Sequence, residues 1–273
     1  ALESLQLNRR RFYRDDHGNM SAEMEFAGRL AVVTGGGSGI GEAICHVLAE
    51  RGARVVVADI NFEAAEKVSN SLPGCQDHRA VEVDVGESAS VEKLFQVIEG
   101  FSDGTPVSII INNAGTGALF TSITDASEDD FDRIMKTNLK GTFLMSRAGI
   151  RLMLAAAIKE GAVVNVSSLA AKYGVRGIAS YVASKAGILG LTRCMALDVA
   201  GTGIRCNAVL PGFTETPLSE HLSEDEKNQL TASIPLSRPA QPREVAQVVA
   251  FLCSPQSSYM IGSCVDVSGG AMV

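Results

Sequence analysis

The residues best suited to chemistry in this sequence are a serine, a tyrosine and a lysine in its second half. Tyr181 and Lys185 stand at positions i and i+4, which places both side chains on one face of a helix. Ser168 lies upstream, after an apolar run (162–166) that predicts a strand. A phenol exchanges a proton with a carbonyl or alcohol oxygen, a neighbouring ammonium stabilises its phenolate and lowers its pKa, and a serine hydroxyl orients the substrate oxygen. The group therefore predicts proton transfer at an alcohol or ketone.

A glycine-rich turn near the start of the predicted domain is the second chemical feature. The apolar run 30–34 predicts a strand, the glycine-rich segment 35–41 follows at once, and 42–50 has a helical pattern. Glycine permits positive φ and close approach of a ligand, and the first N–H groups of a helix bind a pyrophosphate. A strand, a glycine turn and a helix in this order predict a dinucleotide site.

The kind of dinucleotide is indicated by Asp59, which ends the second apolar run (54–58). A carboxylate at this place accepts hydrogen bonds from the adenosine ribose hydroxyls and repels a 2′-phosphate. The helix expected from Phe62 has a better capping residue in Asn61. We therefore predict NAD rather than NADP as the cofactor.

Strands and helices alternate along the rest of the chain. Further strands are expected over 80–84, 107–111, 203–210 and 263–267. Helices are expected over about 88–100, 131–158, 181–199, 224–230 and 243–253. Such alternation, with nearly continuous apolar strands, predicts one α/β domain whose parallel sheet is buried on both faces. We expect an amino-terminal extension over 1–27, an NAD-binding domain over 28–273, and a substrate lid over about 213–241.

Composition excludes several classes of protein. The net charge of −7 makes nucleic acid a poor partner, and the apolar runs are too short to span a bilayer. The 6 cysteines include no CxxC pair, which indicates free thiols in a reducing compartment. No metal site is expected from the sequence. We expect a cytoplasmic location, and the arginines of 9–14 leave a mitochondrial one open.

Taken together, the motifs resemble the short-chain dehydrogenases/reductases over about residues 28–273. The carrying residues are the glycine turn 34–41, the run 112–115 (Asn-Asn-Ala-Gly), Asn138, Ser168, Tyr181 with Lys185, and Pro211-Gly212 with Thr216. The resemblance implies a Rossmann-type, doubly wound, seven-stranded parallel sheet in a single domain. It also implies a homotetramer, which suits the long apolar helical region.

The resemblance implies a role for each residue of the group. Tyr181 would be the acid and base. Lys185 would be its partner and would hold the nicotinamide ribose. Ser168 would orient the substrate, and Asn138 would hold a water in a proton relay. The cofactor contacts implied are Gly35, Ser38, Gly39, Ile40, Asp59, Ile60, Asp84, Val85, Asn113, Ala114, Gly115, Tyr181, Lys185, Pro211, Gly212, Thr214 and Thr216.

The carboxyl-terminal half is similar to the hydroxysteroid dehydrogenases and bacterial 3-oxoacyl-carrier-protein reductases of that family. The similar stretches are 203–213, 248–252 and 268–270. The resemblance implies an NAD(H)-dependent oxidoreductase that interconverts a secondary alcohol and a ketone. A 17β-hydroxysteroid and a 3-hydroxyacyl/3-oxoacyl thioester are the leading substrates. A sugar or polyol dehydrogenase and a non-catalytic dinucleotide-binding sensor are the alternatives. Segment 195–199 has no basic residue to meet an acidic carrier protein, so we expect a small-molecule partner.

Overall fold

A computed structural model of the chain describes residues 24–74, 77–220 and 222–272, and its strands form one parallel sheet. The strands are β1 (Leu30–Thr34), β2 (Arg54–Asp59), β3 (Arg79–Glu82), β4 (Val107–Asn112), β5 (Gly161–Val166), β6 (Ile204–Pro211) and β7 (Cys264–Val267). Their order is β3-β2-β1-β4-β5-β6-β7, which confirms the predicted seven-stranded sheet. The order reverses between β1 and β4, and in such sheets the crevice at the carboxyl ends of the strands there binds the ligand.

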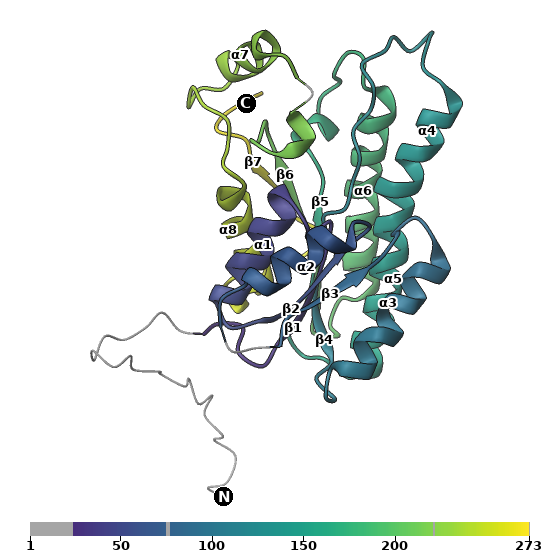
Figure 1. Cartoon of the computed structure of the whole chain (residues 1–273), viewed down its shortest axis with the longest axis vertical. Coiled ribbons are helices and arrows are strands. Elements are labelled where there is room, and N and C mark those ends of the chain that lie inside the picture. Colours follow the sequence, from purple (N-terminus) through teal and green to yellow (C-terminus); the bar gives the residue numbers. More distant parts are fainter. Residues whose placement is uncertain (1–23, 75–76, 221, 273) are drawn as a thin grey trace, which may run out of the picture.

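Helices cover both faces of the sheet (Figure 1). On one face α1 (Gly39–Glu50), α2 (Phe62–Ser71) and α8 (Pro242–Cys253) share a core with the strands. On the other face α3 (Ser88–Phe101), α5 (Gly141–Ala155) and α6 (Ala179–Asp198) enclose a second core. Figure 1 shows α4 (Glu128–Ile134) on this second side and α7 (Glu224–Ala232) apart from both layers. The two apolar layers explain why the central strands carry almost no polar residues.

Two asparagines interrupt the apolar interior where β4 and β5 approach the second helical layer. Asn112 Nδ2 donates to Asn165 Oδ1 and to Ser146 Oγ, each at 2.7 Å. Asn165 Nδ2 in turn donates to Thr192 Oγ1 at 2.8 Å. These buried hydrogen bonds link both strands to α5 and α6. Helix α5 follows the turn that contains Asn138, and α6 contains Tyr181 and Lys185.

The long helical region predicted over about 131–158 is present as a continuous helical run over 128–155, but it includes a π-helical turn that the sequence did not predict. The structure divides this region into α4, a π-helical turn η1 (Met135–Lys140) and α5. At the start of α5, Thr142 Oγ1 donates to the backbone oxygen of Asn138, which lies in the π turn, at 2.7 Å. A π turn inserts one extra residue and re-aims the side chains around it, and such turns are frequent at functional sites. The π turn therefore affects the direction in which the Asn138 side chain points.

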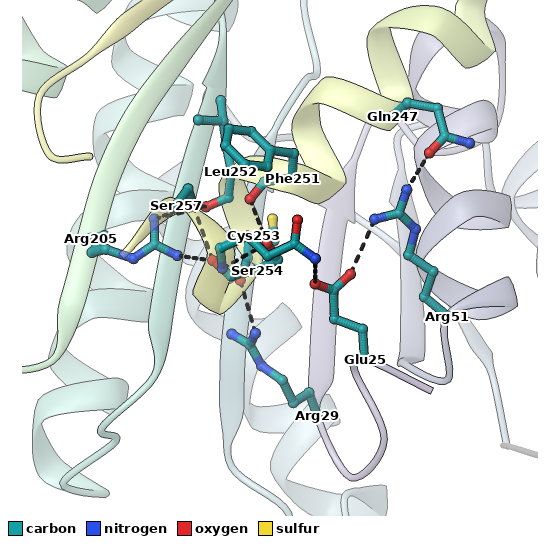
Figure 2. Close-up of polar contacts among 11 residues, drawn as sticks. Glu25, Arg29, Arg51, Arg205, Gln247, Phe251, Leu252, Cys253, Ser254 and Ser257 are labelled. Atoms are coloured by element: carbon teal, nitrogen blue, oxygen red, sulfur yellow. Dashed lines mark hydrogen bonds and ion pairs between the residues drawn. The ribbon is translucent and has the colours of Figure 1, made fainter. Parts of the chain in front are cut away.

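The carboxyl end of α8 is held by two half-buried arginines near the amino-terminal ends of β1 and β6 (Figure 2). Arg29 Nη1 donates to the backbone oxygen of Cys253 at 2.9 Å. Arg205 donates to the backbone oxygens of Leu252 at 3.0 Å and Ser254 at 2.9 Å. The last carbonyls of a helix have no partner within the helix, and cations are favourable beside them. These contacts anchor α8, which packs on α1 below the glycine turn.

Residues of both the predicted extension and the predicted lid pack against the rest of the domain. Phe26, within the predicted extension, is fully buried in the first core, and Glu25 pairs with Arg51 at 3.1 Å. In the predicted lid, Ile234 is buried against Leu169, so the base of that segment is fixed. Across the described ranges of the chain, no helix is long and apolar enough to cross a membrane.

Candidate active site

The serine and the tyrosine predicted for proton transfer meet at the carboxyl end of β5. Ser168 follows β5 and caps a short 3-10 helix, where its Oγ accepts from Ala170 N–H at 3.2 Å. Tyr181 lies in the first turn of α6, and its side chain is hydrogen-bonded to that of Ser168. The backbone N–H of Ala170 uses one acceptor position of the serine, which leaves its hydroxyl proton for the tyrosine or a substrate oxygen. The strand end and the helix start thus place a hydroxyl beside a phenol.

Lys185 is buried one helical turn beyond Tyr181. Its Nζ donates to the backbone oxygen of Val166 at 3.0 Å and lies 5.7 Å from the centroid of the tyrosine ring. Ser167 Oγ donates to the Lys185 backbone oxygen at 2.8 Å, which ties β5 to α6. Burial lowers the pKa of Lys185 to about 8, because the charged ammonium loses hydration. The side chain is therefore cationic at neutral pH but close to its titration range.

The pKa of Tyr181 differs from the sequence-based expectation. The sequence predicts that Lys185 lowers this pKa, whereas in the structure burial raises it above its usual value. The hydrogen bond with Ser168 opposes the rise and is smaller in effect. The lysine ammonium donates to Val166 O. Tyr181 is thus a protonated phenol at neutral pH, the form that donates to a carbonyl oxygen.

Asn138 is fully buried on the π turn and holds the loop that follows β4. Its Oδ1 accepts from Thr116 N–H at 2.8 Å and its Nδ2 donates to Thr116 O at 3.0 Å. A Cβ on Gly115 would lie 3.3 Å from both Asn138 Oδ1 and Lys185 Nζ. The loop, the asparagine and the lysine are therefore in close proximity. The water-holding role of Asn138 stays a prediction.

A cleft of about 580 Å³ runs along the glycine turn, where the strand order reverses. Its lining includes twelve of the predicted cofactor residues: Gly35, Ser38, Gly39, Ile40, Asp59, Ile60, Asp84, Val85, Asn113, Ala114, Gly115 and Thr216. Five other predicted contacts are not part of this lining: Tyr181, Lys185, Pro211, Gly212 and Thr214. Thr214 is buried and donates from its hydroxyl to Gly212 O at 3.1 Å.

The cleft also includes residues that the sequence reasoning missed: Val83, Thr116, Arg133, Lys136, Thr137, Pro217 and Leu218. Arg133, Lys136 and Thr137 face the cleft from α4 and η1, and their i, i+3, i+4 spacing was the available signal. Arg133 Nη1 donates to Thr116 Oγ1 at 2.6 Å, so it also supports the loop after β4.

The glycine turn fits the pyrophosphate of a dinucleotide. A Cβ on Gly41 would lie 1.9 Å from Gly35 O, so only glycine allows the turn to close this tightly. In the described part of the chain, the Ser38 side chain makes no capping hydrogen bond to α1, which leaves the first helical N–H groups for an anion. Asp59 Oδ2 accepts from Gly37 N–H and Oδ1 from Asn61 N–H, both at 2.9 Å. The carboxylate is thereby fixed at the edge of the cleft.

Two further expectations concern the cap of α2 and a metal site. Asn61 caps α2 by accepting from Ala64 N–H at 3.1 Å, so Asp59 is not the helix cap. Among the residues that the structure describes, no group of three or more His, Cys, Asp or Glu side chains could hold a metal ion. The candidate reactive groups beside the cleft are the phenol of Tyr181, the hydroxyl of Ser168 and the ammonium of Lys185.

Comparison with known proteins places this fold and site in one family. A family model described as enoyl-(acyl carrier protein) reductase matches residues 35–272. The chain is 39% identical over 260 residues to a (3R)-3-hydroxyacyl-CoA dehydrogenase of Rattus norvegicus, covering 92% of this chain and 99% of that one. It is 36% identical over 255 residues to a 3-oxoacyl-(acyl-carrier-protein) reductase FabG of Thermotoga maritima, covering 92% and 100%. The chain belongs to the short-chain dehydrogenase/reductase family.

A solved structure supports the same assignment. A 3-ketoacyl-(acyl-carrier-protein) reductase of Brucella melitensis, complexed with NADH, superposes with a TM-score of 0.84 and 32% identity. The match covers 90% of this chain and 99% of the other. The protein is an oxidoreductase that acts on a CH–OH group with a nicotinamide dinucleotide cofactor.

Proposed function

We propose that this protein interconverts a (3R)-3-hydroxyacyl thioester and the corresponding 3-oxoacyl thioester, with NAD(H) as its cofactor. The observation that carries the proposal is the grouping of Tyr181 beside Ser168 at the sheet edge, with Lys185 Nζ 5.7 Å from the centroid of the tyrosine ring. Relatives that this chain matches over nearly their whole length are named for 3-hydroxyacyl-CoA and 3-oxoacyl substrates, which supports the substrate class.

The proposed mechanism assigns one step to each side chain. Ser168 donates to the ketone oxygen and orients it toward Tyr181, which gives its phenolic proton to that oxygen during reduction. In the oxidation the same tyrosine, as phenolate, takes the proton of the alcohol. The Lys185 ammonium stabilises the phenolate left on the tyrosine. When bound along the glycine turn, the cofactor supplies or accepts the hydride.

Apolar side chains beside the cleft favour a lipid-like substrate over a sugar or polyol. Leu218 lines the cleft, and its Cδ1 lies 3.6 Å from where a Cβ on Gly117 would be. Leu119 and Phe120, which lie after Gly117 in the segment that follows β4, are exposed. Exposed apolar groups beside a pocket mark a surface that binds apolar ligands. An acyl chain and a steroid both suit such a rim.

A substrate panel with both cofactors tests the proposal. The purified protein is assayed with (3R)- and (3S)-3-hydroxyacyl-CoA, 17β-estradiol and sorbitol, each with NAD+ and with NADP+. We expect kcat/KM for the (3R)-thioester with NAD+ to exceed the other values by about tenfold or more, because a site built to hydrogen-bond its substrate rejects analogues that leave polar groups unpaired. A higher kcat/KM for estradiol would replace the thioester by the hydroxysteroid. Activity with none of the alcohols would defeat the proposed function.

Replacement of Asp59 by alanine should reduce the preference for NAD. Asp59 lines the cleft, where its carboxylate would accept from ribose hydroxyls and its charge would oppose a 2′-phosphate. Hydrogen bonds to a charged group contribute about 1.5–3 kcal/mol, so the ratio of kcat/KM for NAD to that for NADP should fall roughly tenfold or more. Steady-state kinetics with both cofactors measure the ratio.

The matched control for that replacement is Asp59→Asn. It removes the charge but keeps an oxygen that can accept from Gly37 or Asn61, as Asp59 does now. If the alanine variant changes the ratio only by loosening the glycine turn, the asparagine variant should retain the NAD preference of the original chain. An unchanged ratio in both variants would remove Asp59 from cofactor selection.

We also propose that the protein forms a homotetramer. Support comes from a largely apolar groove of about 880 Å³ that is lined by α4, η1, the first turn of α5, and α6. Leu139, Phe143 and Leu191 line it, and Phe143 is exposed in the single chain. Burying such surface is favourable in an oligomer. Sedimentation velocity measures the mass, and a monomer would contradict the proposal.

A further inference from the structure

Ser184, the residue between the tyrosine turn and Lys185, is fully buried and joins two elements of the site. Its hydroxyl donates to the backbone oxygen of Tyr181 at 2.7 Å. The hydroxyl oxygen of Ser184 also accepts a hydrogen bond from Asn138 Nδ2 at 3.1 Å. The first contact stays within α6, whereas the second crosses to the π turn η1. Ser184 is thus the side chain through which the tyrosine helix holds the asparagine.

The direction of these hydrogen bonds fixes the orientation of the asparagine amide. A carbonyl oxygen can only accept a hydrogen bond, so Ser184 uses its single hydroxyl proton on Tyr181 O. The end of the Asn138 amide that faces Ser184 must therefore be the donor. The NH₂ group therefore faces Ser184 and Thr116 O, which leaves Asn138 Oδ1 to accept from Thr116 N–H. The reversed amide would set two acceptors against each other at Ser184.

We propose that Ser184 is a positioning residue of the reaction, which orients Asn138 and, through it, the Gly115–Thr116 loop against Lys185. The inference rests on the proposed function, because it concerns the same site. A Cβ on Gly115 would be 3.3 Å from both Asn138 Oδ1 and Lys185 Nζ, so a turned amide would change the surroundings of the lysine. Ser184 acts only through Asn138 and touches neither substrate nor cofactor.

A purely helical role for Ser184 makes the opposite prediction. A serine hydroxyl that bonds back to an earlier carbonyl of its own helix adds little stability and often bends the helix. Alanine is the better helix former, so Ser184→Ala would then leave turnover unchanged and the protein as stable or more so. A loss of turnover that depends on Asn138 distinguishes the two roles.

The test is a double-mutant cycle of Ser184→Ala and Asn138→Ala, alone and together. We expect Ser184→Ala to lower kcat by about tenfold, while KM and the NADH dissociation constant change by less than about twofold. In the Asn138→Ala background the same replacement should change kcat by less than about twofold, because its effect passes through the missing amide. Equal effects in both backgrounds, or an unchanged kcat in Ser184→Ala, would overturn the proposal.

Ser146→Ala is the matched control. Ser146 is a fully buried serine on α5 whose hydroxyl accepts from Asn112 Nδ2 at 2.7 Å, as part of the polar contacts inside the sheet. Its loss should lower the melting temperature, since a buried donor is left unpaired, without changing kcat. A fall in kcat with Ser146→Ala as large as that with Ser184→Ala would make the effect one of general stability and would overturn the proposal.

The design separates this inference from the proposed function. Wild-type activity on the thioester decides the proposed function, and the cycle is measured with whichever alcohol of the panel the wild type oxidises fastest. If none is oxidised, crystal structures of the wild type and of Ser184→Ala with NAD decide the inference. An Asn138 amide that turns away from Thr116 supports it, and an amide that keeps both Thr116 hydrogen bonds overturns it.

Discussion

Tyr181→Phe is expected to lower kcat by about three to four orders of magnitude while the NADH dissociation constant changes little. The replacement removes the hydroxyl that, in the proposed mechanism, exchanges a proton with the substrate oxygen, and it keeps the ring. General acid–base catalysis contributes roughly 10²–10⁴-fold, and here the phenol is also the partner of Ser168. Steady-state turnover gives kcat, and fluorescence titration gives the NADH dissociation constant.

Tyr259→Phe is the control for this replacement. Tyr259 is fully exposed, so loss of its hydroxyl should leave both quantities unchanged. Residual activity of Tyr181→Phe above roughly a tenth of the wild-type value would exclude Tyr181 as the acid and base, since even the weakest general acid–base contribution is larger than this. Loss of NADH binding together with turnover would point instead to a collapsed site.

The raised pKa of Tyr181 predisposes the site toward reduction at neutral pH. Burial keeps the phenol protonated, which is the state needed to donate to a ketone oxygen. Oxidation of the alcohol needs the phenolate, so kcat in that direction should rise as pH increases toward the tyrosine pKa. The lowered pKa of Lys185, about 8, works against this rise, because the neutral amine stabilises the phenolate less.

The fold was predictable from the sequence because its signals are local. The apolar run 30–34, the glycines that follow and a helical pattern form one unit within about twenty residues, and each part agrees with the others. The roles of Asp59 and Asn61 could be told apart for the same reason, because a residue at a strand end and a residue that caps a helix have different geometric requirements. Half of the predicted cofactor residues that line the cleft belong to these local units.

The π turn at Asn138 was not predictable, because hydrophobic periodicity does not register one inserted residue. Segments α4 and α5 both follow a helical repeat. The side-chain contact beside the π turn, from Thr142 Oγ1 to Asn138 O, also occurs in regular α-helices and so gives no signal of the turn. The orientation of Asn138 also depends on Ser184, 46 positions farther along the chain. Contacts of this kind exist only after the elements pack.

The arginines that hold α8 illustrate the same limit at longer range. Arg29 reaches Cys253 across 224 positions of sequence, and Arg205 reaches Leu252 across 47. In a linear sequence each is an isolated basic residue next to an apolar strand, which is more typical of the surface than of a buried cap. Their role becomes visible only when the sheet places both beside the last turn of one helix (Figure 2).

Gly41→Ala is expected to destabilise the protein and to abolish dinucleotide binding. The added Cβ would lie 1.9 Å from Gly35 O and 2.6 Å from Asn113 Nδ2, so the glycine turn must open. The first of these atoms is backbone and cannot rotate away. Overpacking in a buried site costs about 1–3 kcal/mol and sometimes more. A turn held open no longer presents the α1 N–H groups, so the NADH dissociation constant should rise about a hundredfold or more.

Thermal unfolding with and without NADH measures both effects of Gly41→Ala. The wild type should melt at a higher temperature when NADH is added, and the variant should show no such rise, because a ligand stabilises only the state that binds it. Gly100→Ala on α3 is the control: a Cβ there would meet no described atom within 4 Å, so the variant should keep the NADH-dependent rise and gain up to about 1 kcal/mol from helix propensity. A Gly41→Ala protein that still melts higher with NADH would show that the turn tolerates the methyl group, and the pyrophosphate would then have to be held elsewhere in the cleft.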